Sequence, residues 1–267
     1  KLDLIILKKI PSIFKNFYIQ FFSLKSNYYN INKIEFLKLF FLHFLKQNKL
    51  RKKYKKITHK FSSQNKKIIY FPFHFQPERS TDPEAGFYSD QINAALSLSK
   101  VVPDDYVIWI KEHPRQSPLE FPNLKRYYYR ELYDFEILSN LNNVRLLDIN
   151  YPTSKILNKT KFVASCTGSV LWEALVKGIP AVRFGSTWHD NCKSCYYFDE
   201  FLKNTISFDE ISKIKKEKVI ENVKLFLVEF EKYTIESSNA DQFAKYSKLP
   251  FKDQIKNLSK AISNLVR

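Results

Sequence analysis

The stretch Lys161–Gly185, KFVASCTGSVLWEALVKGIPAVRFG, decides the fold because it contains a complete strand–turn–helix–strand unit. It begins with a short apolar run of strand type, which the turn Thr167–Gly168–Ser169 follows. From Val170 to Lys177 the apolar residues have helical spacing, and Gly178–Ile179–Pro180 is a helix stop. A second apolar run then reaches Gly185. The pattern therefore predicts one βαβ unit.

The first turn of this unit exposes the N-terminus of a helix. Such an end presents free N–H groups and a partial positive charge, so it suits a phosphate group. The chain has only four glycines, and Gly168, Gly178 and Gly185 fall at the turns of this unit. Because the chain uses glycine so sparingly, we expect it where backbone geometry requires it.

Strands and helices alternate along the middle of the chain. The expected strands before the unit are residues 67–73, 106–110 and 144–147, and the expected helices are 89–100, 124–141 and 154–158. This alternation predicts an α/β fold with a doubly wound, parallel, Rossmann-like sheet.

Helical segments flank the predicted sheet on both sides in sequence. We expect a basic, mostly helical leader over 1–63, in which Ile34–Lys60 is the clearest helix, with a short linker at its end. A nucleotide-sugar-binding domain should span 64–205, and C-terminal helices should span 206–267. The chain has no Met, and residue 1 is Lys, so we expect it to be part of a longer protein or to be trimmed at its N-terminus, and any missing domain would precede Lys1.

Charge is concentrated in the leader. Residues 1–67 hold 17 Lys or Arg against Asp3 and Glu35, whereas the remaining 27 basic residues face 25 acidic ones. A near-neutral body argues against nucleic acid as a partner. The leader suits peripheral contact with an anionic membrane surface, or it packs on the following domain with its basic end in solvent. Three cysteines give no disulfide framework, which favours a cytoplasmic location, peripheral to the inner membrane face if the leader binds lipid.

Three polar loops should emerge at one edge of the sheet, at the carboxyl ends of their strands. They are Gln76–Gly86, Lys111–Arg115 and Cys166–Ser169. Ligands of open α/β sheets bind in that crevice. Each loop alone is more often structural, since a His before Pro or a Thr-Gly-Ser helix cap is common. Their convergence favours a binding site.

The side chains of these loops have the chemistry for a nucleotide. Lys111 and His113 can donate to phosphate oxygens, and the hydroxyls of Thr167 and Ser169 can join the helix N–H groups. One turn into the helix, Glu173 can accept from a ribose hydroxyl. The acidic loop offers Glu78 and Asp82 as base or nucleophile.

These residues resemble a known family. The chain is similar to the C-terminal nucleotide-binding half of GT-B glycosyltransferases and, more closely, to bacterial surface-polysaccharide proteins related to the β-Kdo transferases. The matching motifs are Gln76-Pro77-Glu78, Lys111-Glu112-His113-Pro114, Ser165-Cys166-Thr167-Gly168-Ser169, Trp172-Glu173-Ala174, Gly178-Ile179-Pro180 and Phe184-Gly185.

The resemblance assigns roles to individual residues. It implies that His113, Thr167, Gly168 and Ser169 hold the nucleotide phosphate, that Lys111 and Pro114 belong to the same nucleotide site, and that Glu173 binds ribose. Glu78, with Asp82 second, would be the catalytic carboxylate, and His113 would assist departure of the phosphate. Gln76 and Arg115 would complete the loops.

The resemblance also implies a reaction. We expect a metal-independent glycosyltransferase without a cofactor, which moves an acidic, Kdo-like sugar from a CMP-activated donor to a glycan or lipid-linked acceptor. Capsule or lipopolysaccharide assembly would be its setting. One alternative is a CDP-polyol phosphate transferase of a teichoic-acid-like polymer, and another is a non-catalytic domain that binds nucleotide or glycan.

The cysteines raise two further possibilities. His189-x-x-Cys192-x-x-Cys195 has the spacing of zinc ligands, but a fourth ligand is not evident and the resemblance implies no metal. Cys166 lies in the phosphate turn, where we expect a small buried side chain and not a nucleophile.

Overall fold

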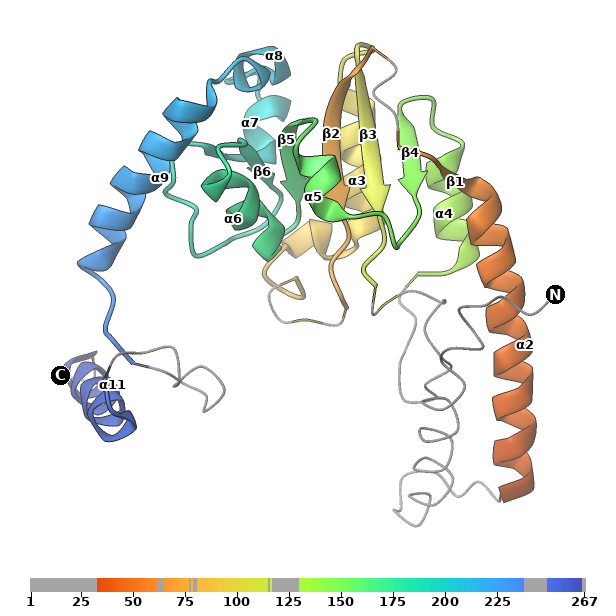
Figure 1. Cartoon of the computed structure of the whole chain (residues 1–267), viewed down its shortest axis with the longest axis horizontal. Helices are drawn as coiled ribbons and strands as arrows, with labels where there is room; N and C mark the ends of the chain where they lie inside the picture. Colours follow the sequence, from red (N-terminus) through yellow and green to blue (C-terminus); the bar gives the residue numbers. More distant parts are fainter. Residues whose placement is uncertain are drawn as a thin grey trace.

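A computed structural model describes most of the chain (Figure 1). The described residues are 33–61, 65–76, 78, 81–114, 116, 130–237 and 249–265. Several expectations lie outside them: those for the first half of the leader, for the linker at 62–64, for Arg115 and for the start of the helix expected over 124–141.

A seven-stranded, wholly parallel sheet forms the centre of the described structure (Figure 1). The strands are β1 (Thr58–His59), β2 (Lys67–Pro72), β3 (Tyr106–Lys111), β4 (Val144–Leu147), β5 (Thr160–Ser165), β6 (Ala181–Arg183) and β7 (Cys195–Tyr197). Their order across the sheet is β1-β4-β3-β2-β5-β6-β7. Apart from the short edge strand β1, this is the strand order of a dinucleotide-binding Rossmann sheet, with its switch point between β2 and β5.

Helices cover both faces of the sheet, as Figure 1 shows. One face packs against α2 (Lys33–Ile57), α3 (Gln91–Val101), α4 (Leu132–Ser139), α7 (Phe198–Leu202) and α8 (Phe208–Ser212). The other packs against α5 (Thr153–Leu157), α6 (Ser169–Val176) and α9 (Lys216–Glu231). The remaining elements are the 3-10 turn η1 (Gly86–Ser89) and α11 (Phe251–Leu265). The predicted doubly wound fold is confirmed.

The composition of β2 explains why both faces are covered. Successive side chains of a strand point to opposite faces, and here both sets are apolar. Ile69 and Phe71 belong to the core on the α3 side, whereas Ile68 and Tyr70 belong to the core on the α6 side. A strand without a polar face must be buried on both sides, which requires two layers of helices.

The structure differs from the sequence-based expectation at the ends of the sheet. The helix expected to reach Lys60 ends at Ile57, and Thr58–His59 pairs with β4 as β1. β7 was not expected, and it forms because Cys195–Tyr197 pairs alongside β6. The described part of the helix expected over 124–141 begins only at Leu132. The two short strands are decided by the strands they pair with, whereas α4 begins at Leu132 because Glu131 and Asp134 form a capping box there.

The helix stop after α6 has the predicted geometry. Gly178 adopts a φ of +78°, in the left-handed region that favours glycine, and a Cβ there would also meet the Lys216 side chain at 2.2 Å. Among the helices of the described ranges, none combines the length and the apolar character needed to cross a bilayer.

Candidate nucleotide site

A cavity of about 600 Å³ opens at the carboxyl ends of the strands, at the switch point between β2 and β5. Its walls come from the loops after β2, β3, β5 and β6, together with the first turns of α5 and α6. Most of the candidate residues line it: Glu78, Lys111, His113, Pro114, Thr167, Gly168, Ser169 and Glu173. Segments that are up to about a hundred residues apart in the chain therefore share one cavity, as the parallel topology requires.

Two candidates lie elsewhere in the structure, and one lies outside the described residues. Gln76 is buried behind the cavity wall, and Asp82 is exposed without lining the cavity. Arg115 is not described. Of the two candidate carboxylates, only that of Glu78 borders the cavity. The backbone carbonyl of Glu78 accepts the N–H groups of Thr81 and Asp82, both at 2.9 Å.

The N-terminus of α6 forms the part of the cavity best suited to an anion. Gly168 is its N-cap and provides no side-chain cap, so the first N–H groups of the helix have no side-chain acceptor there. Beside them the Thr167 hydroxyl is buried without a hydrogen-bond partner among the described residues. A phosphate at this position would satisfy both kinds of donor, and the helix dipole would favour its charge.

Gly168 is required by lack of space and not by backbone conformation. Its φ of −70° and ψ of 151° are open to any residue. A Cβ at this position, however, would lie 2.6 Å from Nε2 of His74. His74 is fixed from both sides, because Nε2 lies 2.5 Å from the Ser165 hydroxyl and Nδ1 lies 3.0 Å from that of Thr81. The turn at Thr167–Ser169 thus rests directly on a buried imidazole.

Gly168→Ala should therefore displace the turn or the imidazole. We expect a loss of about 1–3 kcal/mol in the free energy of unfolding, as for other overpacked sites. Nucleotide affinity should fall about tenfold or more, since the turn would no longer present its donors in place. Urea denaturation and calorimetric titration with CMP measure the two effects.

Gly86→Ala is the matched control for that substitution. A methyl group there meets nothing within 4 Å, although the φ of +54° makes it strained. It should cost about 1–2 kcal/mol in stability and leave nucleotide affinity unchanged. Equal nucleotide affinities in the two variants would contradict the role given to Gly168.

Lys111 lies in the cavity wall with its ammonium group already engaged. Nζ donates to the carbonyl of Tyr151 at 3.0 Å and to the Thr153 hydroxyl at 2.7 Å. Burial lowers the pKa of this lysine. Two of its three hydrogens are thus used within the protein, and one remains for a ligand oxygen.

A buried ion pair between Glu112 and Arg130 supports the His113 loop from behind. Nε and Nη2 of Arg130 donate to the two Glu112 carboxylate oxygens at 2.6 and 2.8 Å. Nη1 donates to Oε1 of Gln76 at 2.7 Å, and Nη2 also donates to the His74 carbonyl at 2.9 Å. The Glu112 carboxylate in turn accepts the backbone N–H of His113 at 2.5 Å. This network joins the loops after β2 and β3.

Sequence reasoning did not find that network. Glu112 stands inside the Lys111–Pro114 motif but was given no role, and nothing in the local sequence marks Arg130. Gln76 was expected as a site residue, but its side chain faces Arg130 and the Ser89 carbonyl, to which Nε2 donates at 2.7 Å. The one signal that the sequence offers is Glu112 itself, an acidic residue between Lys111 and His113, directly after the buried strand β3.

The loop after β6 brings His189 and Trp188 to the cavity. His189 was considered only as a zinc ligand. Within the described ranges, no group of three or more His, Cys, Asp or Glu side chains is arranged to hold a metal ion. Cys192 and Cys195 are buried free thiols, and burial raises the pKa of Cys195 to about 12.

Cys166 behaves as a buried structural residue. Its thiol donates to the Tyr88 carbonyl at 3.3 Å, and burial raises its pKa to about 12. It is also absent from the cavity wall. A thiol with this pKa is protonated at neutral pH and is a poor nucleophile.

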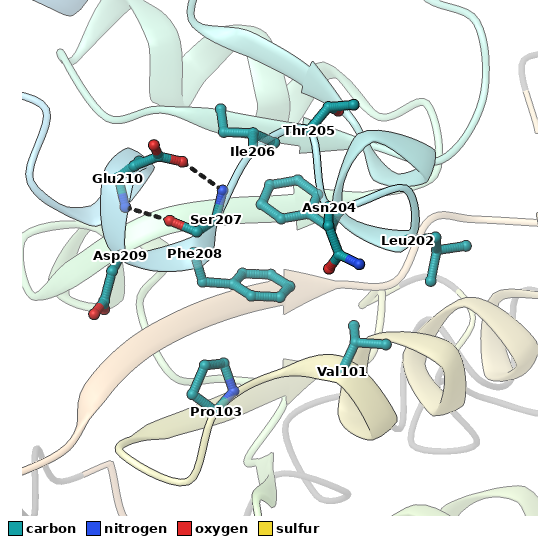
Figure 2. A pocket seen from close by; sticks show the side chains of 11 residues that line it. Val101, Pro103, Leu202, Asn204, Thr205, Ile206, Ser207, Phe208, Asp209 and Glu210 are labelled. Atoms are coloured by element: carbon teal, nitrogen blue, oxygen red, sulfur yellow. Dashed lines mark hydrogen bonds between the residues drawn. The ribbon is translucent and has the colours of Figure 1, made fainter.

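A second cavity, of about 620 Å³, lies at the opposite edge of the sheet and is shown in Figure 2. The two acidic side chains that border it, Asp209 and Glu210, already have partners. Asp209 accepts from Lys67 Nζ at 2.6 Å, and Glu210 accepts the Ser207 N–H at 2.6 Å in a capping box. These contacts cap the N-terminus of α8 and occupy both carboxylates, so neither carboxylate is a candidate catalytic or ligand-binding group.

Comparison with known proteins adds two similar folds. No protein-family profile and no curated protein matches the sequence. One of the two similar folds is that of KpsC of Thermosulfurimonas dismutans, a β-Kdo 2,7 transferase. The match covers 69% of this chain and 62% of the KpsC chain, at 16% identity and a TM-score of 0.40. A Listeria monocytogenes protein assigned as a UDP-N-acetylglucosamine 2-epimerase matches 68% of this chain and 52% of its own, at 12% identity and a TM-score of 0.36.

The likeness of these two proteins to this chain concerns the fold alone. The chain spans about three fifths and about half of their lengths. Its own sheet order, two helical layers and switch-point cavity define a Rossmann-like α/β protein. This is the kind of fold that the GT-B resemblance of the sequence implied.

Proposed function

We propose that this chain forms the donor-binding part of a glycosyltransferase that uses a CMP-activated, acidic, Kdo-like sugar. The acceptor would be a glycan or a lipid-linked sugar of a bacterial surface polysaccharide. The observation that supports this most is the cavity in which Lys111, His113 and the N-terminus of α6 meet. A cation, an imidazole and a helix N-terminus are together the donor set for a nucleotide phosphate.

The proposed reaction places a carboxylate opposite that donor set. Glu78 accepts the proton of the acceptor hydroxyl while the acceptor oxygen bonds to the anomeric carbon. The bond from that carbon to the phosphate oxygen breaks, and CMP leaves with the electron pair. The α6 N–H groups, the Thr167 hydroxyl and His113 stabilise the charge that develops on the phosphate.

In this proposal the nucleoside lies on the side of the cavity bordered by Tyr70 and Thr153. Glu173 lies close enough to Tyr70 to act, together with burial, in raising the pKa of its phenol. The carboxylate of Glu173 is exposed and lines the cavity one turn into α6. It is therefore available to accept from a ribose hydroxyl when the phosphate lies at Thr167–Ser169.

We also propose peripheral contact with an anionic membrane through the basic leader. In the described part of α2, Lys52, Lys53, Lys55 and Lys56 are exposed. Exposed lysines near an anionic leaflet each contribute about 1 kcal/mol. The contact would bring the cavity near a lipid-linked acceptor.

A thermal-shift panel with CMP, CDP, UDP, GDP and ADP tests the nucleotide assignment. A ligand at about 100 times its dissociation constant adds roughly 2.7 kcal/mol. For a chain of this size the melting temperature should rise by about 5–10 °C with CMP. In His113→Ala that rise should disappear.

The exposed His59 of β1, remote from the cavity wall, supplies the control. His59→Ala should keep the full shift. A shift with CDP in preference to CMP would favour the polyol-phosphate alternative, and a shift with UDP or GDP would overturn the cytidine donor. No shift with any nucleotide would refute the proposal.

A further inference from the structure

His189 presents an unsatisfied, buried imidazole at the cavity wall. Its side chain is 1% exposed, and neither Nδ1 nor Nε2 has a hydrogen-bond partner among the described residues. Leaving buried polar atoms unpaired is unfavourable, so such atoms call for an explanation. His189 lines the same cavity as the phosphate turn, and a ligand in that cavity can supply the missing partners.

The indole of Trp188 lies against this imidazole. The two ring centroids are 5.1 Å apart, and Trp188 also contacts Trp172 at 4.6 Å. Trp188 is 52% exposed, although it belongs to an aromatic group that includes Phe226 and Phe230. Because the His189 nitrogens are covered, a ligand reaches them only when a neighbour moves, and the half-exposed indole is the neighbour with room to move.

The position of this pair in the cavity indicates what it could bind. The phosphate turn lies at the start of α6, and Glu173 lies on the side of Tyr70 and Thr153. Trp188 and His189 border the cavity from the loop after β6, beside Trp172 on the flank of α6 toward α9. With the nucleoside on the Tyr70 side, the space near Trp188 is left for the group beyond the phosphate.

We propose that Trp188 and His189 form a sugar subsite, in which the indole packs on the apolar face of a sugar ring and the imidazole hydrogen-bonds an uncharged hydroxyl pair. This proposal rests on the proposed function, because it assigns the group on the far side of the same phosphate. A neutral imidazole has one donor and one acceptor, and a sugar hydroxyl, which both donates and accepts, can pair with either nitrogen.

The charges around the subsite support a neutral partner. Burial lowers the pKa of His189 to about 4, with Asp190 raising it and Arg183 lowering it to smaller extents. The charge of Arg183 is already paired, because its guanidinium contacts the Asp190 carboxylate at 3.1 Å, donates to the Gly185 carbonyl at 3.1 Å and lies over the Tyr197 ring. Of the described lysines and arginines, the one that lines the cavity is Lys111, on the β3 loop. An ionised group of the sugar would therefore be more stable near Lys111 than near His189.

The transferred sugar and the acceptor's terminal sugar have the same chemistry, so the experiment has two arms. The chain has three tryptophans, Trp109, Trp172 and Trp188, whose indole N–H signals can be followed separately by NMR. In the first arm, uncharged methyl hexosides are titrated with and without saturating CMP. In the second, the affinities of CMP and CMP-Kdo are compared.

The expected result is a shift of the Trp188 signal, with Trp109 unchanged. A shift with free methyl hexosides identifies the acceptor as the source. A gain in affinity of CMP-Kdo over CMP, accompanied by the same shift, identifies the donor. If neither arm moves Trp188, the subsite is refuted, while nucleotide binding at His113 can still hold.

Variants separate binding from folding. His189→Phe keeps the ring shape and removes both unpaired nitrogens, so the fold should be at least as stable, and sugar affinity should fall about tenfold. Trp188→Ala, at a half-exposed position, should weaken sugar binding about tenfold as well. Tyr233→Ala is the matched control, since Tyr233 is an exposed aromatic that does not line the cavity. Unchanged sugar affinity in both His189→Phe and Trp188→Ala would overturn the proposal.

Discussion

Arg130→Ala should destabilise the protein by about 3–5 kcal/mol, because it leaves the Glu112 carboxylate buried without its counter-ion. The side chains of Arg130 and Glu112 are 3% and 1% exposed, so solvent cannot replace the lost guanidinium. The substitution also removes the donors to Gln76 and to the His74 carbonyl. A domain is stable by only about 5–15 kcal/mol, so the loss is a large fraction of the whole. Urea denaturation at neutral pH measures it.

Lys218→Ala is the control for an ion pair in solvent. Lys218 pairs with Glu221 at 3.0 Å, but the two side chains are 58% and 57% exposed. This pair should contribute less than about 1 kcal/mol. A double variant, Glu112→Leu with Arg130→Met, should recover part of the loss, because it removes both buried charges. If Arg130→Ala costs no more than Lys218→Ala, the buried network does not support the fold as described.

The central strands could be predicted because their own residues decide their environment. Ile68, Ile69, Tyr70 and Phe71 form a continuous apolar run, which is stable only between two layers. The short strands β1 and β7 could not be predicted in this way. Residues Thr58–His59 and Cys195–Tyr197 carry no pattern, and they are extended because β4 and β6 offer free edges.

The candidate site was predictable where topology alone brings residues together. Loops that follow parallel strands meet at one edge, so Lys111, His113 and Thr167 share the cavity. Sequence cannot tell which side of a loop residue faces a ligand. Gln76 therefore looked like a ligand-binding residue although its amide pairs with Arg130. His189 was hidden for a similar reason, since its cysteine spacing suggested a metal and its place in the wall of the same cavity as Thr167 is a tertiary fact.

Two buried histidines should make the fold strongly sensitive to acid. Burial lowers the pKa of both His74 and His189 from 6.5 to about 4. As the pH falls, both histidines of the unfolded chain therefore become protonated near pH 6.5. In the folded chain the same two side chains stay neutral until about pH 4. The contribution of these two neutral histidines to the free energy of unfolding is fully present above pH 6.5. It is lost as the pH falls from 6.5 to about 4. The difference corresponds to about 3 kcal/mol for each histidine.

For His74 the hydrogen bonds give the physical reason. The Ser165 hydroxyl can donate to the Pro72 carbonyl at 3.3 Å and accept from Nε2–H of His74, which leaves Nδ1 to accept from Thr81. A second proton on the ring would reverse the Thr81 bond, and the nearby charge of Arg130 opposes it as well. His74→Gln should be less stable at pH 7 but should lose less stability on acidification.

Urea denaturation at a series of pH values between 7 and 4 tests this account. The wild type should lose about 6 kcal/mol of its free energy of unfolding across that range, which is the sum of the two histidines. His74→Gln and His189→Phe should each remove about half of the slope, and the exposed His59→Ala should leave it unchanged. The carboxylates of Asp209 and Glu210, whose pKa values are lowered, act in a different window, because their contribution is lost only as the pH falls below about 4. If the free energy of unfolding still falls as steeply with pH in both histidine variants, other groups cause the acid sensitivity. That result would contradict the neutral imidazoles on which the sugar subsite depends.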